Sequence, residues 1–291
     1  MCQRLKKTGC YLLIIVLLPY IVTIFLSGPP DLTTAGLDEN MVQAQTEDGE
    51  VSISMRDYAI GILAKEISAE YNEEALKAQA VLIRTKIYKK MQDEGSSAIQ
   101  EDFWTKEEME EAWGAASYML YLRKLEKAWD ETEGQVLMFE DNLAHTPYFR
   151  LSNGSTRDGK EVLGEGYPYL KIVECPLDIE VVEQMQTTTL EDMDAEVLTC
   201  DSSGYVLVVR VGQENVSGEE FRSNYHLASS CFTLQKYDGK LRITTRGVGH
   251  GLGMSQNTAN ELAKDGKTSR EILQYFFEGT EIREVADIIS T

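Results

Sequence analysis

The chain has 291 residues, of which 43% are hydrophobic, and its 28 Lys and Arg against 48 Asp and Glu give a formal net charge of −20. This length is enough for one large domain or two small ones with a buried core. The negative charge excludes proteins that bind nucleic acid through its phosphates, because that binding requires basic residues. A polymer partner is therefore expected to be held by hydrogen bonds and shape, with no nucleic acid involved.

The N-terminal segment combines basic residues with an apolar run at residues 11–26, and no acidic residue occurs before Asp31. The run is slightly short of the ~20 residues that a spanning helix needs, but its Gly, Cys and Ser neighbours extend it. No A-x-A cleavage pattern follows it. We therefore predict a single-pass membrane anchor at residues 1–27, with a cytoplasmic N-terminus and the rest of the chain outside. The alternative is a cleaved signal peptide, which exports the same domain.

Beyond the anchor, the composition predicts a linker and one domain. Residues 28–50 are polar and interrupted by Gly and Pro, as in a juxtamembrane linker. Residues 51–291 begin with helical patterns, continue with strand patterns from Gly134 and end with two helices. This order predicts a two-lobed α+β domain rather than a parallel sheet with crossover helices.

Capping residues mark the expected helix starts. Ser54 with Asp57 begins a helix to about residue 68, and Asn72 begins a long helix that stops before Gly95. A capping box of Thr105 and Glu108 begins a helix around residues 109–125. Ser255 begins a helix that stops near Gly266, and a second box, Thr268 with Glu271, begins the last helix.

The strand pattern covers residues 135–139, 147–151 and 205–211. Two further strands, residues 232–237 and 240–245, flank Asp238-Gly239, which is a strong signal for a β-hairpin.

The cysteines predict no covalent framework. Cys2 and Cys10 belong to the anchor, which leaves Cys175, Cys200 and Cys231 outside. An odd number cannot all pair, and no two have C-x-x-C spacing, so we expect neither a disulfide framework nor a zinc knuckle.

Glu66 is the first candidate for chemistry. On a helix it shares one face with Ala59, Ile62 and Leu63, because residues three, four and seven apart are neighbours. A carboxyl among apolar side chains loses solvation, which raises its pKa and makes it a proton donor near neutral pH. The alternative is a Glu at the edge of an apolar stripe that reaches out to water.

The next helix places polar groups in an apolar seam. Gln79 lies between Leu76 and Ile83 and must find a hydrogen-bond partner, and Arg84 lies beside the same stripe. Either side chain can orient Glu66 or a substrate oxygen, or it can bridge two helices internally.

Two turns are candidates for ligand contact. Ser152-Asn153-Gly154 offers a hydroxyl, an amide and a close backbone approach, which suits sugar hydroxyls but is also an ordinary turn. Glycine occupies every second position from Gly247 to Gly253, with His250 in the middle, and G-x-G-x-x-G is not matched. In a strand this alternation leaves one face bare, so that a sugar or a helix can approach the backbone, with His250 on the other face.

The histidines favour no metal site, because His145, His226 and His250 are not at metal-ligand spacing. A metal-dependent hydrolase built from His145 and His250 is kept as an alternative, but we expect no metal and no cofactor.

Three segments together resemble the stage II sporulation protein D family of peptidoglycan lytic transglycosylases and amidase enhancers. They are YAIGILAKEISAEYNEEALKAQAVLIRT (58–85), SNGSTRDGKEVLGEGYPYLKIVECPLD (152–178) and GVGHGLGMSQ with the sequence that follows it (247–282). The third is close to the family's G-x-G-H-G-V-G-M-S-Q motif and is the most specific of the three.

The resemblance assigns roles residue by residue. Glu66 falls on the family's catalytic acid. The residues that fall on its other motif positions, and that the resemblance implies bind substrate, are Lys77, Gln79, Arg84, Ser152, Gly154, His250, Ser255 and Gln256. Many members carry a His in an H-S-T-S-G-G run, and here the equivalent segment reads Phe149-Arg-Leu-Ser-Asn-Gly154. If that His serves binding or catalysis, this chain has replaced it.

The resemblance implies a membrane-anchored enzyme that cleaves the MurNAc–GlcNAc linkage of glycan strands outside the membrane, on strands stripped of peptide by a partner amidase during engulfment. Most glycosidases need two carboxyl groups. A lytic transglycosylase uses the C6 hydroxyl of the muramic acid as nucleophile, so one carboxyl that gives and then takes a proton is enough. The alternative is a non-catalytic glycan-binding protein that enhances an amidase.

Overall fold

A computed structural model of the chain describes residues 41–46, 49–94 and 101–286. Residues Val42–Thr291 group into one unit by backbone proximity. The predicted anchor, residues 1–27, and most of the predicted linker lie outside the described residues. Within the described ranges, no helix has both the length and the apolar character that crossing a bilayer requires.

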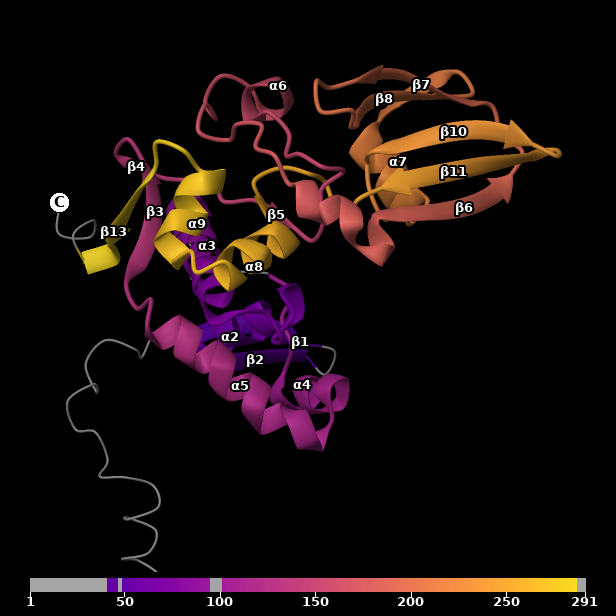
Figure 1. Cartoon of the computed structure of the whole chain (residues 1–291). Helices are drawn as coiled ribbons and strands as arrows, with labels where there is room; N and C mark the ends of the chain where they lie inside the picture. The colour runs from indigo at the N-terminus through magenta and orange to yellow at the C-terminus, as the bar shows by residue number, and fades with distance from the viewer. Residues whose placement is uncertain (1–40, 47–48, 95–100, 287–291) are drawn as a thin grey trace, which may run out of the picture. The chain divides into compact units, whose positions relative to one another are not determined.

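The described residues form a mixed α+β fold with eight α-helices and five small sheets, which confirms the predicted class (Figure 1). The last part of the predicted linker differs from expectation, because β1 (Met41–Thr46) and β2 (Gly49–Ser54) pair with each other. Val42 and Ala44 are buried, so the alternation of this segment belongs to a strand.

The first two helices begin where their caps predict. The Ser54 hydroxyl accepts a hydrogen bond from the Asp57 N–H (3.0 Å) at the start of α2 (Met55–Glu66). The Asn72 side-chain oxygen accepts from the Glu74 N–H (3.1 Å) at the start of α3 (Glu73–Glu94). Each bond satisfies an N–H that the first helical turn leaves free.

The single helix expected around residues 109–125 is wrong, because two helices occupy this region. The Thr105–Glu108 capping box does begin α4 (Lys106–Trp113), but that helix ends at Gly114. Gly114 has φ of 73°, a left-handed conformation that stops a helix and suits glycine. The chain then continues as α5 (Ala115–Asp130).

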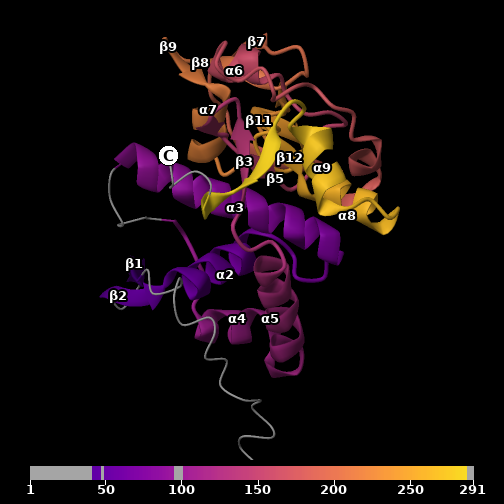
Figure 2. The same ribbon diagram turned by 90° about the vertical axis from the view of Figure 1, so that its left-hand side faces the viewer.

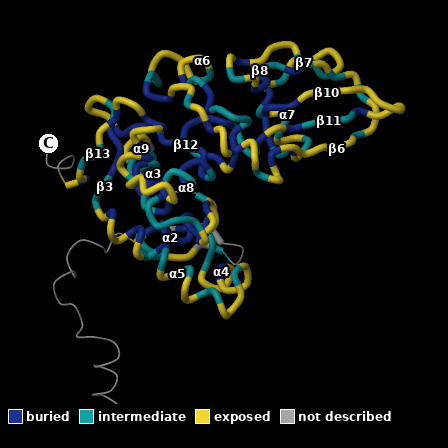
Figure 3. Tube along the Cα trace, in the orientation of Figure 1, coloured by how far each residue is buried: buried dark blue, intermediate teal, exposed yellow. Residues whose placement is uncertain are grey.

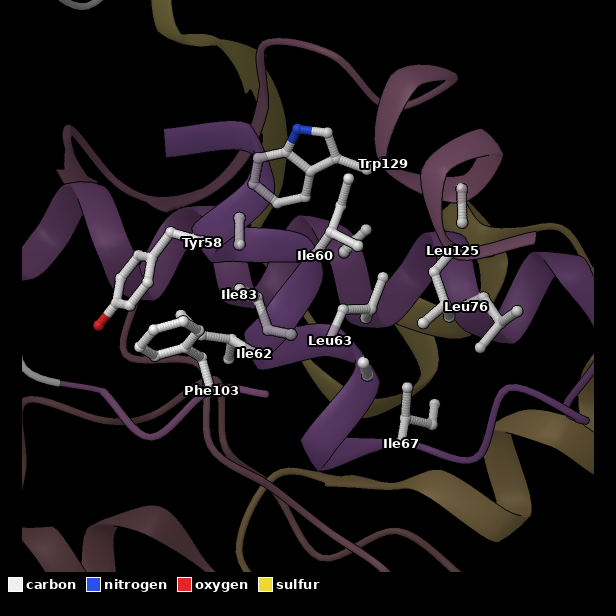
Figure 4. Packing of buried hydrophobic residues seen from close by; sticks show 14 of the residues in the cluster. Tyr58, Ile60, Ile62, Leu63, Ile67, Leu76, Ile83, Phe103, Leu125 and Trp129 are labelled. Carbon is white, nitrogen blue, oxygen red and sulfur yellow. The ribbon is translucent and has the colours of Figure 1, made fainter. Parts of the chain in front are cut away.

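The helices α2, α3 and α5 share a hydrophobic core (Figure 4). Ile62 and Leu63 of α2 pack in it with Ile83 of α3 and Leu125 of α5, and all four are at most 1% exposed. Burial of large aliphatic side chains contributes about 1.5–3 kcal/mol each. This core therefore fixes the end of α2, where Glu66 lies.

A second core covers another face of α3. Helices α8 (Gln256–Lys264) and α9 (Ser269–Phe276) contact α3 (Figure 2), and their starts match the predicted Ser255 cap and Thr268–Glu271 box. Strand β3 (Gln135–Phe139) lies beside them, between β13 (Glu281–Glu284) and β4 (Asn142–Leu143).

The strand-rich part has a hydrophobic core of its own. One sheet has the order β10-β11-β6, and the other has the order β7-β8-β9. Their bounds are β6 (Met185–Glu191), β7 (Ala195–Cys200), β8 (Val206–Val211), β9 (Glu214–Ser217), β10 (Phe232–Tyr237) and β11 (Lys240–Arg246). Helix α7 (Gly218–Asn224) packs with them. The β10–β11 hairpin is confirmed, because Asp238 and Gly239 have φ of 51° and 67° as its tight turn requires.

Short elements connect the two parts. They are β5 (Tyr148–Phe149), the helix α6 (Gly159–Leu163), the 3-10 helices η1 (Pro176–Glu180) and η2 (Val182–Gln184), and β12 (Met254–Ser255). The strand expected at residues 147–151 is therefore shorter, although Leu151 continues it with a bridge to Val248. Phe149 of β5 and both residues of β12 are buried, whereas most residues of α6, η1 and η2 are exposed, and buried and exposed segments alternate along this region (Figure 3).

Candidate functional site

A cavity of about 590 Å³ lies where the connecting segments meet helices α2, α3 and α7. Its volume is within the ~300–1,000 Å³ range of ligand pockets. Two of the predicted site residues, Glu66 and His250, line it. The other polar or aromatic residues of its wall are Lys86, Lys89, Lys90, Asp93, His145, Thr146, Tyr148, Arg157 and Glu219.

Glu66 is the last residue of α2 and its side chain reaches both the cavity and solvent. Loss of solvation among the surrounding protein atoms raises the pKa of the Glu66 carboxyl, and the charge of Glu101 adds to this effect, whereas Lys86 opposes it. A raised pKa is the property that a general acid needs near neutral pH. The pKa shift has the predicted direction, and the exposed position of Glu66 matches the alternative in which a Glu at the edge of the apolar stripe reaches out to water.

Gln256 connects the end of α2 to the glycine-rich segment. Its side-chain N–H donates to the backbone carbonyl of Glu66 (2.8 Å) and to the Gln79 side-chain oxygen (3.3 Å). Gln79 and Gln256 are both buried. The two glutamines therefore hold the backbone that carries Glu66, and neither lines the cavity wall.

Asp178 joins the other two motif segments. Its buried carboxylate accepts hydrogen bonds from the Ser152 N–H (2.8 Å), the Ser255 hydroxyl (2.7 Å), the Asn257 amide (3.0 Å) and the Thr258 hydroxyl (2.8 Å). The hydroxyl of Ser152 in turn accepts from the Gly154 N–H (3.1 Å). Ser152, Gly154 and Ser255 thus lie together around Asp178 and outside the cavity wall.

The glycine-rich segment is not the strand that the alternation predicts. Gly247, Gly249, Gly251 and Gly253 all have φ between 78° and 113°, which is the left-handed region. A Cβ on Gly247 would lie 2.6 Å from the Leu151 carbonyl oxygen, and one on Gly249 would lie 2.7 Å from Cβ of Phe149. The segment is a tightly packed loop, and glycine is required by both its backbone conformation and its close contacts.

His250 is held within this loop rather than on a strand face. Its Nδ1 accepts a hydrogen bond from the Leu252 N–H (3.1 Å), and its ring lies 5.7 Å from that of Phe149. Burial lowers the pKa of His250 to about 4, and the charges of Arg222 and Arg157 act in the same direction. His250 is therefore neutral at physiological pH and is not equipped to donate a proton there.

Arg157 and Glu219 line the cavity, and sequence reasoning missed both. The Arg157 guanidinium donates to Asp201 (2.5 Å), to Glu219 (3.1 Å) and to the backbone carbonyl of His250 (3.0 Å). Arg157 has 3% of its side chain exposed. No spacing signal connects these residues, because their partners come from distant parts of the chain.

Tyr148 is a further cavity residue that the sequence did not identify. Its hydroxyl is buried and has no hydrogen-bond partner among the described residues. Burial and the nearby charge of Glu66 raise the pKa of Tyr148 above its usual range. The hydroxyl is therefore a hydrogen-bond donor that lies on the same cavity wall as Glu66.

Lys77 and Arg84 lie away from the cavity. Lys77 pairs with Glu73 (3.4 Å), Glu74 (2.8 Å) and Glu131 (2.6 Å). The Arg84 guanidinium is buried, donates to the carbonyls of Thr132 (2.6 Å) and Trp129 (2.9 Å), and stacks on the Trp129 ring. In the structure both side chains make internal connections between α3 and the end of α5.

The metal alternative finds no ligand cluster among the described residues, where no group of three or more His, Cys, Asp or Glu is placed to hold an ion. His145 and His250 do line the same cavity. The described cysteines Cys175, Cys200 and Cys231 are free thiols, the first and last of them buried.

The fold and the site thus define an α+β protein in which three separate sequence segments meet around one carboxyl-bearing cavity. The family model for stage II sporulation protein matches residues 45–139. Stage II sporulation protein D of Bacillus subtilis is 30% identical over 259 residues, which cover 80% of this chain and 75% of the relative. The Bacillus amyloliquefaciens protein of the same name is 28% identical over 265 residues, or 82% and 77% of the two chains. An uncharacterized protein of Brachyspira hyodysenteriae is 26% identical over 256 residues, or 79% and 67%. The chain belongs to the stage II sporulation protein D family.

Proposed function

We propose that the protein is a sporulation enzyme that cleaves the MurNAc–GlcNAc linkage of peptidoglycan as a lytic transglycosylase, with Glu66 as its acid and base. The observation that carries this proposal is the position of Glu66, a carboxyl with a raised pKa on the wall of a cavity of about 590 Å³. Family membership supports the sporulation role, and the names of the Bacillus relatives agree with it.

In the proposed mechanism, protonated Glu66 donates its proton to the leaving glycosidic oxygen. The C6 hydroxyl of the MurNAc then attacks the anomeric carbon of that MurNAc, and Glu66 accepts the proton of this hydroxyl. Neutral His250 takes no part in proton transfer, whereas the hydrogen bond from Gln256 holds the Glu66 backbone in place. The products are 1,6-anhydro sugars, and no cofactor is needed.

Substitution of Glu66 tests this proposal. Glu66→Gln keeps the shape of the side chain but has no proton to donate, so release of anhydro products from defined glycan strands should fall by roughly 10²- to 10⁴-fold. Glu70→Gln, on the exposed turn that follows, is the matched control and should keep wild-type activity. Persistence of anhydro products at the wild-type rate in Glu66→Gln contradicts the assignment.

The pH dependence gives a second readout. Activity requires protonated Glu66, so the rate should decline as pH rises through the pKa of this group, which lies above its ordinary value.

Strands with and without stem peptides, compared in the same assay, show whether the substrate is peptide-free.

We further propose that the protein is anchored at the outer face of the membrane and acts with a cell-wall amidase and other membrane proteins of engulfment. The second candidate function, a glycan-binding enhancer of that amidase, is favoured by Phe149, which stands where many family members have a His. Phe149 packs against His250 behind the cavity and offers no polar group. A pure enhancer would bind glycan strands and release nothing from them.

A further inference from the structure

Among the described residues, three carboxylates lie on the cavity wall: Glu66 of α2, Asp93 of α3 and Glu219 of α7. The protein holds Glu219 in a defined position. It lies in the first turn of α7, which belongs to the strand-rich part of the fold, whereas Glu66 ends α2 in the helical part. The cavity wall therefore has carboxyls from both parts, and Glu219 is the one from the strand-rich part.

Two guanidinium groups orient Glu219. Its Oε1 lies 3.1 Å from Nη1 of Arg157, and its Oε2 lies 3.3 Å from Nη1 of Arg222. Arg157 is itself fixed by Asp201 and by the His250 carbonyl, and Asp201 has no exposed side-chain surface. A carboxylate held through both oxygens cannot rotate freely, so little entropy is lost when a ligand binds it.

Glu219 nevertheless remains available to a ligand, because 41% of its side chain is exposed. Each ionised carboxyl oxygen can accept more than one hydrogen bond, so the two arginines leave acceptor capacity unused. Sugar hydroxyls and the N–H of an N-acetyl group are donors of the kind that such an oxygen accepts. The carboxylate would repel an anionic group placed directly against it, so the groups that it binds are the neutral ones of the sugar.

We propose that Glu219 forms a sugar-binding subsite in which its carboxylate accepts hydrogen bonds from hydroxyl or acetamido N–H groups of the glycan strand. Arg157 and Arg222 act as positioning residues that hold this carboxylate. The subsite rests on the proposed function for the identity of its ligand, but it requires no bond cleavage.

Binding without turnover tests the subsite. In the Glu66→Gln background, the affinity for peptide-free glycan strands is compared for Glu219→Gln and Glu220→Gln by titration calorimetry. A hydrogen bond to a charged acceptor is stronger than one to a neutral acceptor, and the difference corresponds to roughly three- to tenfold in affinity. Glu219→Gln should therefore weaken glycan binding by that factor. Glu220 is adjacent, exposed and outside the cavity wall, so its substitution removes the same charge and should leave the affinity unchanged.

Three outcomes are decisive. Equal affinity of the two variants, or equal weakening by both, overturns the subsite. If Glu219→Gln also lowers the unfolding temperature, the affinities are measured again at a temperature where both variants are fully folded. Weakening that persists there supports the subsite, and weakening that disappears overturns it. If wild type releases no anhydro products but Glu219→Gln still weakens glycan binding selectively, the proposed activity fails while the subsite stands.

Discussion

At the scale of single residues, the site separates groups that can transfer protons from groups that cannot. Glu66 has a raised pKa and faces solvent through the cavity, whereas His250 has a lowered pKa and uses Nδ1 to accept a backbone hydrogen bond. The histidine at the centre of the most distinctive motif therefore supports the loop, and the carboxyl of a less conspicuous helix is the group suited to chemistry.

His250 should titrate well below an ordinary histidine. Its pKa in the folded protein is about 4, against 6.5 without the surrounding protein, so the unfolded chain binds the extra proton first. His250 thus contributes to stability above pH 6.5, and this contribution is lost as pH falls toward 4. Imidazole chemical shifts from NMR, recorded between pH 8 and 3.5, measure the midpoint directly. A midpoint near 6.5 would show that the ring is solvated and that the loop is built differently.

At the scale of elements, a few buried polar contacts join segments that are distant in sequence. Asp178 of η1 binds the Ser152 turn and the start of α8 at once, through four hydrogen bonds and with no basic partner among them. The geometry of the loop behind the cavity consequently depends on a single carboxylate.

Asp178→Asn should be strongly destabilising. The new amide points N–H groups at donors, which leaves buried polar groups unpaired and costs about 2–4 kcal/mol of unfolding free energy. Asp158→Asn is the control, because Asp158 caps α6 through the N–H groups of Lys160 and Glu161, where Asn serves nearly as well. Chemical denaturation of both variants checks this, and equal stability of the two would contradict the role of Asp178.

Local chemistry explains which elements the sequence predicts. The caps at Ser54, Thr105, Ser255 and Thr268 are confirmed because each depends on residues within one helical turn. The prediction of a glycine-rich strand is wrong, because the alternation of glycines does not determine the backbone angle φ. Here φ follows from contacts with residues far away in sequence, such as Leu151 and Phe149.

The residues of the candidate site also divide into those that local sequence predicts and those that depend on distant contacts. Glu66 is identifiable from its helical face and from the family motif. Arg157 and Glu219 were missed because their contacts join positions 62 and 93 residues apart, and no periodic pattern encodes such pairs.

At the scale of the whole described unit, Arg157 is a buried side chain that connects the strand-rich part to the loop around His250, beside backbone hydrogen bonds such as that from the Gly249 N–H to the Ala228 carbonyl (2.8 Å). Its partners lie after β7, in α7 and in the glycine-rich segment. Because Asp201 is buried, water cannot take the place of Arg157 if the ion pair between them is lost.

Arg157→Met should therefore reduce stability by about 3–5 kcal/mol, the cost of leaving a buried charge unpaired. The comparison is Arg210→Met, which removes exposed ion pairs with Asp194 and Glu196 on the surface of the strand-rich part and should change little. Thermal unfolding followed by calorimetry measures both, and a similar unfolding temperature for the two variants would contradict this ranking.

The hydrogen bond from Gln256 to the carbonyl of Glu66 spans 190 positions of the chain. Closing so long a loop costs entropy that only contacts made later in folding return, so such pairings slow folding. The final shape of the α2 terminus is accordingly a late event, completed only after nearly nine-tenths of the polypeptide has been synthesised. A nascent chain interrupted before this point carries its glutamate without the amide that holds it, and its cavity is unfinished.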